Sequence, residues 1–208
     1  MTRSHTRHLY LTRHAEPGDL GSGLSDRGMR QAELLGRRLA DVPIEALHHG
    51  PLPRAAETAR VVADQLSDDV PPRELGAAGD YVPHLPEHDE LDPEYAGTVL
   101  SFLGDVDPES AARGAALAAE AIELLTGPVA GDTARHELVV THAFTIGWLV
   151  LHALGAPRWR WWGQNHCHTR LTIIRYFPSG PPALVVLNDV THLPADLRWT
   201  GFPAELRP

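Results

Sequence analysis

The stretch HLYLTRHAEPGD, residues 8–19, places an arginine and a histidine directly after a short apolar run. Residues 8–13 are rich in strand-forming side chains and therefore predict a buried strand. Arg13 and His14 then stand at the carboxyl end of that strand. The role of these two residues depends on which other side chains the fold brings to the same end of the sheet.

Strands and helices alternate along most of the chain. Residues 24–42 predict a helix with Ser25 as its N-cap, because apolar side chains recur at helical spacing. Similar patterns predict strands at 44–48, 137–141, 168–177 and 183–187, and helices at 54–66, 108–126 and 145–154. The strands are nearly continuous apolar runs, which is typical of a largely parallel sheet with both faces covered. We therefore expect an α/β fold: a single three-layer αβα domain over residues 1–208, with a largely parallel central sheet flanked by helices.

One part of the chain, residues 68–107, interrupts this alternation. It is rich in proline, glycine and acidic residues and has little periodicity. Long irregular segments in compact domains tend to be functional, so we expect this one to lie beside the active site. Its acidic run at 89–94 favours a leaving group that is not strongly anionic, although a solvated charge run explains it equally well.

Composition excludes several classes of partner. The formal net charge of −9 argues against a general nucleic-acid-binding surface. The longest apolar run, near residues 146–154, falls short of the roughly 20 residues that a membrane helix needs, so we expect no membrane partner. A single cysteine, Cys167, allows no intramolecular disulfide and suits a reducing compartment. We expect a cytoplasmic protein whose oligomeric state, including a homodimer, stays open.

Four side chains from distant parts of the chain should converge. Ligands of open α/β sheets bind beyond the carboxyl ends of the strands. Arg13, His14 and His142 follow predicted strands directly, and Arg54 begins the helix after another strand. Guanidinium groups match phosphate oxygens, and the first turn of a helix also favours an anion. Two arginines and two histidines around one point predict a phosphate pocket with a nitrogen nucleophile.

The same residues lie in motifs that resemble those of the histidine phosphatase superfamily, also called phosphoglycerate-mutase-like. LTRHAE is similar to the Arg-His-Gly signature of that family. Four further stretches agree in order and spacing, namely LSDRGMRQAELLGRRL, HHGPLPRAAETA, VVTHA and LNDVTHL. The resemblance implies phosphoryl transfer without a metal or other cofactor. In it His14 is the nucleophile, Arg13 and Arg54 bind the phosphoryl group, and His142 both binds that group and belongs to the catalytic set.

The resemblance also implies a carboxylic acid that protonates the leaving group, supplied after the second helix. The candidates are Glu74, Asp80, Glu87 and Asp89. The frame AGDYVP fits the family best, so we choose Asp80 and keep Glu74, in PRELG, as the alternative. The acid must start protonated, so we expect it to be partly buried.

Three positions depart from the family pattern. Ala15 replaces the glycine after the catalytic histidine, and Gly50 replaces the serine of the Ser-Pro-Leu-x-Arg segment. EPGDLGSG occupies the stretch where many members carry an asparagine, which weakens assignment as a mutase.

The sequence His166-Cys167-His168 invites a metal site. In a strand the two histidines would point to one face and supply two ligands. Structural zinc sites usually need four ligands with recognisable spacing, so we favour no metal there, and whether these histidines bind anything stays open.

The expected function is hydrolysis of a small phosphomonoester. Three alternatives remain: a phosphoglycerate-type mutase, a phosphatase acting on phosphohistidine or another phosphoprotein, and a phosphate-binding protein without catalysis.

Overall fold

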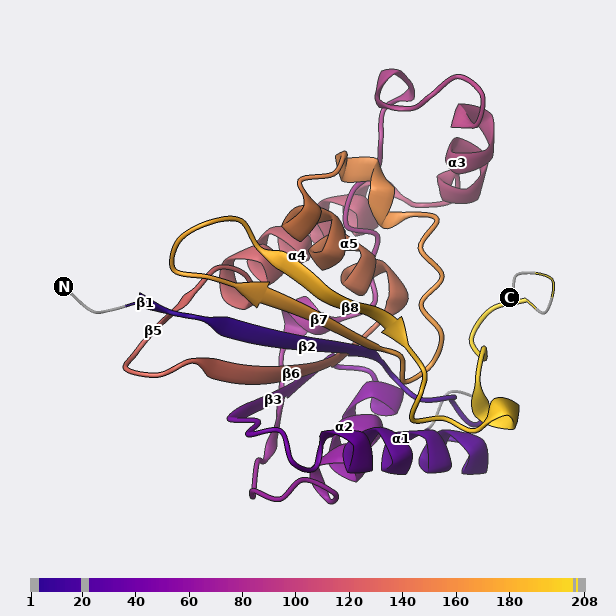
Figure 1. The fold of residues 1–208 in the computed structure, drawn as a ribbon. Coiled ribbons are helices and arrows are strands. Elements are labelled where there is room, and N and C mark those ends of the chain that lie inside the picture. The colour runs from indigo at the N-terminus through magenta and orange to yellow at the C-terminus, as the bar shows by residue number, and fades with distance from the viewer. Residues whose placement is uncertain (1–3, 20–22, 204, 206–208) are drawn as a thin grey trace.

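The computed structural model describes residues 4–19, 23–203 and 205 of the chain. Within them a central sheet runs in the order β4-β3-β6-β2-β7-β8 (Figure 1). The strand bounds are β2 Arg7–Arg13, β3 Ala46–His49, β4 Pro72–Glu74, β6 Arg135–Thr141, β7 Leu171–Tyr176 and β8 Ala183–Asp189. β4, β3, β6 and β2 are parallel, whereas β7 pairs antiparallel with both β2 and β8. The largely parallel sheet is thus confirmed, with an antiparallel edge.

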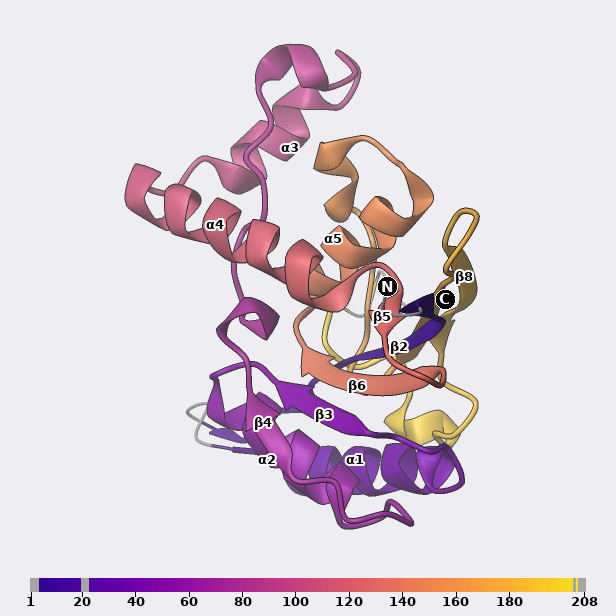
Figure 2. The ribbon, with the colours of Figure 1, turned by 90° about the vertical axis from the view of Figure 1, so that its left-hand side faces the viewer.

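Helices cover both faces of this sheet (Figure 2). α1, Asp26–Leu39, and α2, Pro53–Ala63, lie on one face, and α4, Pro108–Leu125, and α5, Ala143–Leu154, lie on the other. This arrangement confirms the three-layer α/β prediction. A further helix, α3 (Ala96–Leu103), lies beyond α4 and α5, away from the sheet. None of the described helices combines the length and apolar character needed to cross a bilayer.

Alternation along β2 explains how one strand serves two cores. Leu9 and Leu11 are fully buried against α4 and α5, in a cluster that includes Ile146. Tyr10 points to the opposite face and packs in the cluster of α1 and α2, which includes Leu35. Successive strand side chains face opposite ways, so a central strand buried on both faces needs apolar residues at every position.

The start of α1 follows the predicted cap. The Ser25 hydroxyl accepts a hydrogen bond from the Gly28 backbone N–H at 3.0 Å. This contact satisfies one of the backbone donors that the first helical turn leaves unpaired. The cap fixes the point at which the chain leaves the loop that follows His14.

The structure differs from the sequence prediction in three places. The segment 68–107, expected to be irregular, contains the short strand β4 and helix α3, which packs through Val99 onto the cluster of Trp159 and Trp161. A second small sheet pairs β1, Ser4–His5, with β5, Val129–Ala130, and was not predicted. The strand predicted from residue 168 begins only at Leu171.

Candidate active site

The four converging residues come from three connections at one end of the sheet, where the parallel strands finish. This end is on the right-hand side of the sheet in Figure 1. Arg13 ends β2, and His14 follows it. His142 is the residue directly after β6 and the N-cap of α5. Arg54 is the second residue of α2, which follows β3. Because β2, β3 and β6 are parallel, their carboxyl ends meet, as the sequence predicted.

His14 is held in one tautomer by its two ring contacts. Its Nδ1 lies 2.8 Å from the carbonyl oxygen of Ala15, and its Nε2 lies 3.0 Å from Nε of Arg54. A carbonyl can only accept a hydrogen bond and a guanidinium can only donate one. The ring therefore carries its proton on Nδ1 and presents a lone pair at Nε2.

The surroundings of His14 also keep the ring neutral. The residue is 3% exposed. Burial, followed by the nearby His142 and Arg13, lowers the pKa of His14 to about 2. Burial, followed by Arg54 and Arg13, lowers the pKa of His142 to about 3. Each environment disfavours a further positive charge, as desolvation and like charges do.

Two backbone carbonyl groups from the C-terminal part of the chain hold the side chain of Arg13. Its Nη1 donates to the carbonyl oxygens of His166, at 3.0 Å, and Gly201, at 2.8 Å. Gly201 has φ +102°, and a Cβ there would lie 2.5 Å from that nitrogen, so glycine allows the close approach. The buried Nε of Arg13 has no hydrogen-bond partner among the described residues.

Asp80 lies across Arg54 from His14. Its Oδ2 is 2.9 Å from Nη2 of Arg54 and 3.5 Å from Nδ1 of His142. Both ring nitrogens of His142 are buried without a hydrogen-bond partner in the part of the chain that the structure describes. A neutral imidazole has one N–H, and this donor together with the unpaired Nε–H of Arg13 is an arrangement that an oxyanion would satisfy.

The expected burial of Asp80 is wrong. Its side chain is 42% exposed and forms an ion pair with Arg54. The reason is its position at the mouth of the site, after the buried turn of Ala78 and Gly79. Sequence position alone did not reveal this exposure.

Two buried threonines hold the turn that carries Asp80. The hydroxyl of Thr141 donates to the carbonyl oxygen of Ala78, and that of Thr145 donates to the carbonyl oxygen of Gly79, both at 2.7 Å. Thr141 ends β6 and Thr145 lies in the first turn of α5. The carboxylate is therefore positioned by the same two elements that position His142.

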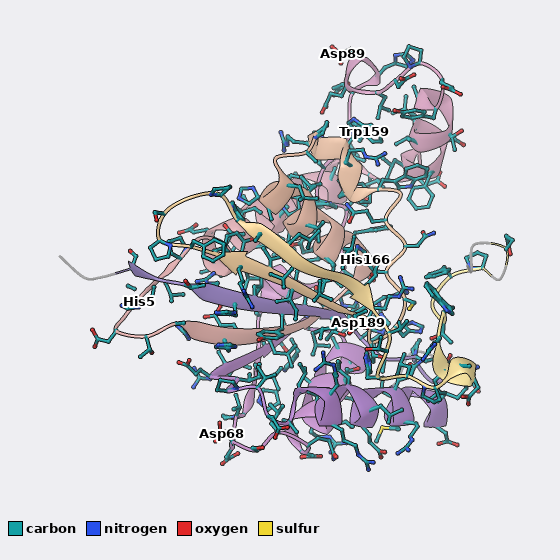
Figure 3. All side chains as sticks on the ribbon, in the orientation of Figure 1. His5, Asp68, Asp89, Trp159, His166 and Asp189 are labelled. Carbon is teal, nitrogen blue, oxygen red and sulfur yellow. The ribbon has the colours of Figure 1, made fainter. Side chains whose placement is uncertain are left out.

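The other candidate acids lie elsewhere. Glu74 is exposed at the end of β4, where it pairs with His49 in the strand ladder. Asp89 lies at the outer tip of the segment that carries α3 (Figure 3). Neither these two nor Glu87 is among the described residues that line the cavity beside His14.

A cavity of about 960 Å³ opens onto these groups. One end is lined by Arg13, His14, Arg54, Asp80 and His142. The rest of its wall combines the aromatic side chains of Phe102, Phe144, Trp161, Trp162 and Phe202 with small and polar residues, among them Gln164, Asn165, His166 and His168. The volume is in the range of small-molecule sites and exceeds what a phosphate ion alone would need.

A third histidine, His168, lines the cavity and was not among the predicted site residues. The ring centroid of His168 lies 5.2 Å from that of His14, at an angle of 45°. From the sequence, His166 and His168 are only possible metal ligands on one face of a strand, and no metal is favoured there. That geometry is wrong, because both precede β7 and the chain turns at Thr169, with φ 51°. The described residues contain no group of three or more histidine, cysteine, aspartate and glutamate side chains arranged to hold a metal.

Comparison with known proteins identifies the family of this chain. Residues 9–190 match the model of the histidine phosphatase superfamily, branch 1. The mitochondrial serine/threonine-protein phosphatase Pgam5 of Caenorhabditis briggsae is 27% identical over 195 residues, which are 90% of this chain and 65% of the relative. The Caenorhabditis elegans protein of the same name is 29% identical, with 91% and 65% covered. The chain thus spans less than two thirds of the length of these curated relatives.

Solved structures agree on the fold. A putative α-ribazole-5′-P phosphatase from Escherichia coli has a TM-score of 0.65 and 22% identity, covering 88% of this chain and 97% of that one. YhfR of Bacillus stearothermophilus has a TM-score of 0.64 and 24% identity, covering 89% and 98%.

Proposed function

Because the chain belongs to the histidine phosphatase superfamily, we propose that it is a metal-independent phosphomonoesterase. It hydrolyses a small phosphorylated metabolite through a phosphohistidine on His14. The phosphoryl group binds among Arg13, Arg54 and His142, and Asp80 is the general acid.

The observation that carries this proposal is the tautomer of His14. A nucleophilic imidazole must be neutral and must offer a lone pair toward the substrate. Nε2 has that lone pair because Nδ1–H is committed to the Ala15 carbonyl oxygen. The same carbonyl would support the ring as positive charge develops on it during attack.

In the first step the Nε–H of Arg54 turns from Nε2 of His14 to a phosphoryl oxygen, Nε2 attacks phosphorus, and the bond from phosphorus to the ester oxygen breaks. The leaving oxygen takes a proton from the carboxylic acid of Asp80, because an alkoxide leaves poorly on its own. Negative charge on the phosphoryl oxygens is offset by the guanidinium groups of Arg13 and Arg54.

In the second step water attacks phosphorus and the phosphorus–nitrogen bond breaks. Asp80, now a carboxylate, takes a proton from that water, and inorganic phosphate leaves. Nε2 regains its lone pair while Nδ1 keeps its proton throughout. The two steps need no co-reactant besides water.

A phosphoprotein phosphatase is the second candidate. It is favoured by the two Caenorhabditis relatives, which are serine/threonine-protein phosphatases. The phosphoryl chemistry would be the same, and the candidates differ only in what fills the cavity beyond the ester oxygen. Comparing a phosphoserine peptide with small phosphomonoesters at equal concentration separates them.

The proposal is tested by hydrolysis of p-nitrophenyl phosphate in excess EDTA, together with trapping of the acid-labile phosphoenzyme. We expect turnover that EDTA leaves unchanged, and labelling that His14→Ala abolishes. His152→Ala, which removes an exposed histidine of α5, is the matched control and should retain both. Normal turnover in His14→Ala would exclude the mechanism, and a wild-type protein that binds phosphate without turnover would favour the non-catalytic alternative. Transfer to a second hydroxyl in place of water would favour a mutase.

A further inference from the structure

The cavity that contains the phosphate-binding residues also has aromatic side chains in its wall. Phe144 and Trp161 meet edge to face, with ring centroids 4.7 Å apart. Phe102 packs edge-on against Phe144 at 6.2 Å and lies 6.0 Å from Trp162. These rings come from α3, α5 and the turn after α5, so the wall is assembled by three segments.

Phe102 is the unusual member of this wall. It is 55% exposed, although it is a large apolar side chain that lines a cavity. Leaving such a ring open to water is unfavourable unless something covers it. Phe102 lines the same cavity as Asp80, so the leaving group of a bound substrate is the natural cover.

The charged residues of the cavity wall limit the chemistry of the leaving group. Among the described residues that line the cavity, the only arginines are Arg13 and Arg54, and there is no lysine. The proposed phosphoryl group takes both guanidinium groups, so neither is left for a second anion. Among the described residues of the cavity wall, a carboxylate or second phosphate on the leaving group would therefore meet no further arginine or lysine.

We infer that the substrate is a phosphomonoester of an uncharged alcohol that carries an aromatic ring. Flat rings gain edge-to-face and offset contacts with other rings beyond the area they bury. This inference rests on the proposed phosphomonoesterase activity and specifies the substrate class of the same site.

The test compares kcat/KM for benzyl phosphate, glycerol 1-phosphate and 3-phosphoglycerate, which are all esters of primary alcohols. We expect a preference for benzyl phosphate of about tenfold or more over each. Phe102→Ala should reduce this preference several-fold, whereas Phe177→Ala, a matched exposed phenylalanine outside the cavity, should leave it unchanged. Equal kcat/KM values for the three esters, or an unchanged preference in Phe102→Ala, would overturn the inference while leaving the phosphatase activity intact. Failure to hydrolyse any of the three would overturn both.

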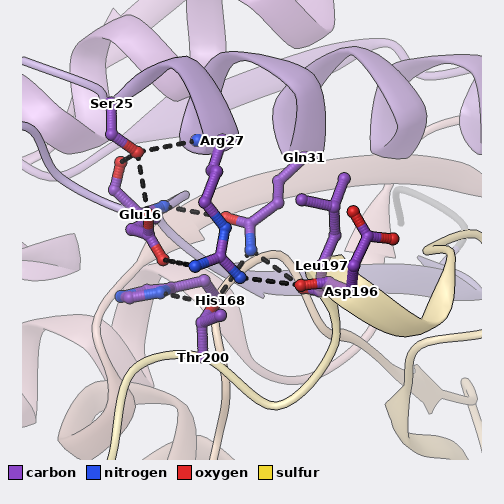
Figure 4. Close-up of polar contacts among 9 residues, drawn as sticks. Glu16, Ser25, Arg27, Gln31, His168, Asp196, Leu197 and Thr200 are labelled. Carbon is purple, nitrogen blue, oxygen red and sulfur yellow. Dashed lines mark hydrogen bonds and ion pairs between the residues drawn. The ribbon is translucent and has the colours of Figure 1, made fainter.

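A separate observation concerns His168. Its Nδ1 lies 2.9 Å from the hydroxyl of Thr200, which in turn lies 2.9 Å from Nε2 of Gln31 (Figure 4). The Gln31 amide has a fixed orientation, because its oxygen accepts from the Glu16 backbone N–H and its nitrogen donates to the Leu197 carbonyl oxygen. The Gln31 amide therefore donates a hydrogen bond to the Thr200 hydroxyl and cannot accept one from it.

This hydrogen bond sets the tautomer of His168. The Thr200 hydroxyl accepts a hydrogen bond from Gln31, so its own proton is available for Nδ1 of His168. A buried hydroxyl proton without an acceptor would be costly, and Thr200 is 4% exposed. Nδ1 is then the acceptor, and the ring proton lies on Nε2. Burial, followed by Arg13 and His14, lowers the pKa of His168 to about 2, so the ring is neutral.

We propose that His168 is a further phosphate-binding residue, which donates a hydrogen bond from Nε2–H to a phosphoryl oxygen. Two neighbouring rings then present opposite groups to the cavity: His14 offers a lone pair to phosphorus and His168 offers a proton to oxygen. The backbone around His168 is held in sparsely populated conformations at Thr169, φ 51°, and Trp199, φ 59°. Such strain persists where surrounding structure fixes it and is common at binding sites.

The tautomer can be read in the wild-type protein by two-bond ¹H–¹⁵N NMR of the histidine rings. We expect the Nδ1–H form for His14 and the Nε2–H form for His168. Inorganic phosphate, measured by calorimetry, should bind about tenfold more weakly to His168→Ala than to the wild type, since hydrogen bonds to charged groups are the stronger ones. His152→Ala serves as the exposed control. An Nδ1–H form of His168, no phosphate binding by the wild type, or unchanged affinity in a folded His168→Ala variant would overturn the assignment. In Thr200→Val, which keeps the imidazole, the Nε2–H form should become less populated and phosphate affinity should fall; unchanged values for both would also contradict it.

Discussion

The Nε–H of Arg54 donates to Nε2 of His14 across 3.0 Å, while Nη2 of the same guanidinium reaches Oδ2 of Asp80 at 2.9 Å. One planar group thus spans the proposed nucleophile and the proposed acid. Its position in the first turn of α2 would otherwise be unfavourable for a cation, because the helix dipole is positive there. A bound phosphoryl group would remove that disadvantage.

Arg54→Lys should therefore be far from conservative. An ammonium group supplies the charge but lacks the fork that contacts His14 and Asp80 together. We expect kcat/KM for p-nitrophenyl phosphate to fall by about 10²–10³, the usual cost of losing one transition-state donor. Arg60→Lys is the matched control, because Arg60 lies on the same helix and pairs with Asp64 in solvent. A loss below about tenfold in Arg54→Lys would show that charge alone suffices.

Asp80→Asn should separate substrates by their leaving groups. An amide cannot protonate the ester oxygen, so esters of poor leaving groups lose the most. We expect kcat for an alkyl phosphate to fall by about 10²–10⁴, and kcat for p-nitrophenyl phosphate to fall far less. Glu74→Gln, at the alternative acid, should change neither, because Glu74 lies outside the cavity. If both esters slow equally in Asp80→Asn, the acid is another group.

Much of this site can be predicted from the sequence. The apolar runs that become β2 and β6 predict parallel strands, and parallel strands end at one edge. That rule alone brings Arg13, His14 and His142 together. Ser25 as a cap follows from local hydrogen bonding, which sequence spacing reports directly.

Other parts depend on contacts that sequence spacing does not report. α3 is short, and its apolar side chains are buried by tryptophans far along the chain, at 159 and 161. His168 reaches the site because β7 runs antiparallel, so its start lies at the edge where β2 ends. The exposure of Asp80 depends on a turn held by Thr141 and Thr145. Each of these features is tertiary, and the catalytic roles of the residues remain predictions.

Acid should destabilise this protein well before its carboxylates titrate. In an unfolded chain histidines have a pKa near 6.5, whereas folding lowers the pKa of His14 and His168 to about 2 and that of His142 to about 3. Below pH 6.5 the unfolded state thus binds more protons, so the free energy of unfolding falls as pH falls. His166 and His192, with the pKa of each lowered to about 4 by burial first, act in the same direction.

The expected slope approaches about 1.4 kcal/mol per pH unit for each such histidine once the pH is well below 6.5. Above pH 6.5 these groups are neutral in both states and contribute no slope. Urea denaturation at pH 7.5, 6.0 and 5.0 measures this slope. His168→Gln should reduce the slope by up to about 1.4 kcal/mol per pH unit, which is the contribution of one histidine. Stability that is flat between pH 7 and 5 would contradict the burial of neutral imidazoles.

Gly50→Ala should displace the proposed general acid, Asp80, although residue 50 makes its contact with Ala78. A Cβ at Gly50 would overlap the carbonyl oxygen of Ala78, in the turn that leads to Asp80. The turn cannot easily yield, because that same oxygen accepts from the buried Thr141 hydroxyl. We expect a loss of about 1–3 kcal/mol in unfolding free energy, as overpacking usually costs. The ratio of p-nitrophenyl to alkyl phosphate turnover should also shift toward that of Asp80→Asn.

Gly97→Ala, in α3 with no atom within 4 Å of the new methyl, is the control and should be neutral or slightly stabilising. Wild-type stability and selectivity in Gly50→Ala would show that the turn has room to move, and that Asp80 is placed by something other than the contact between β3 and this turn.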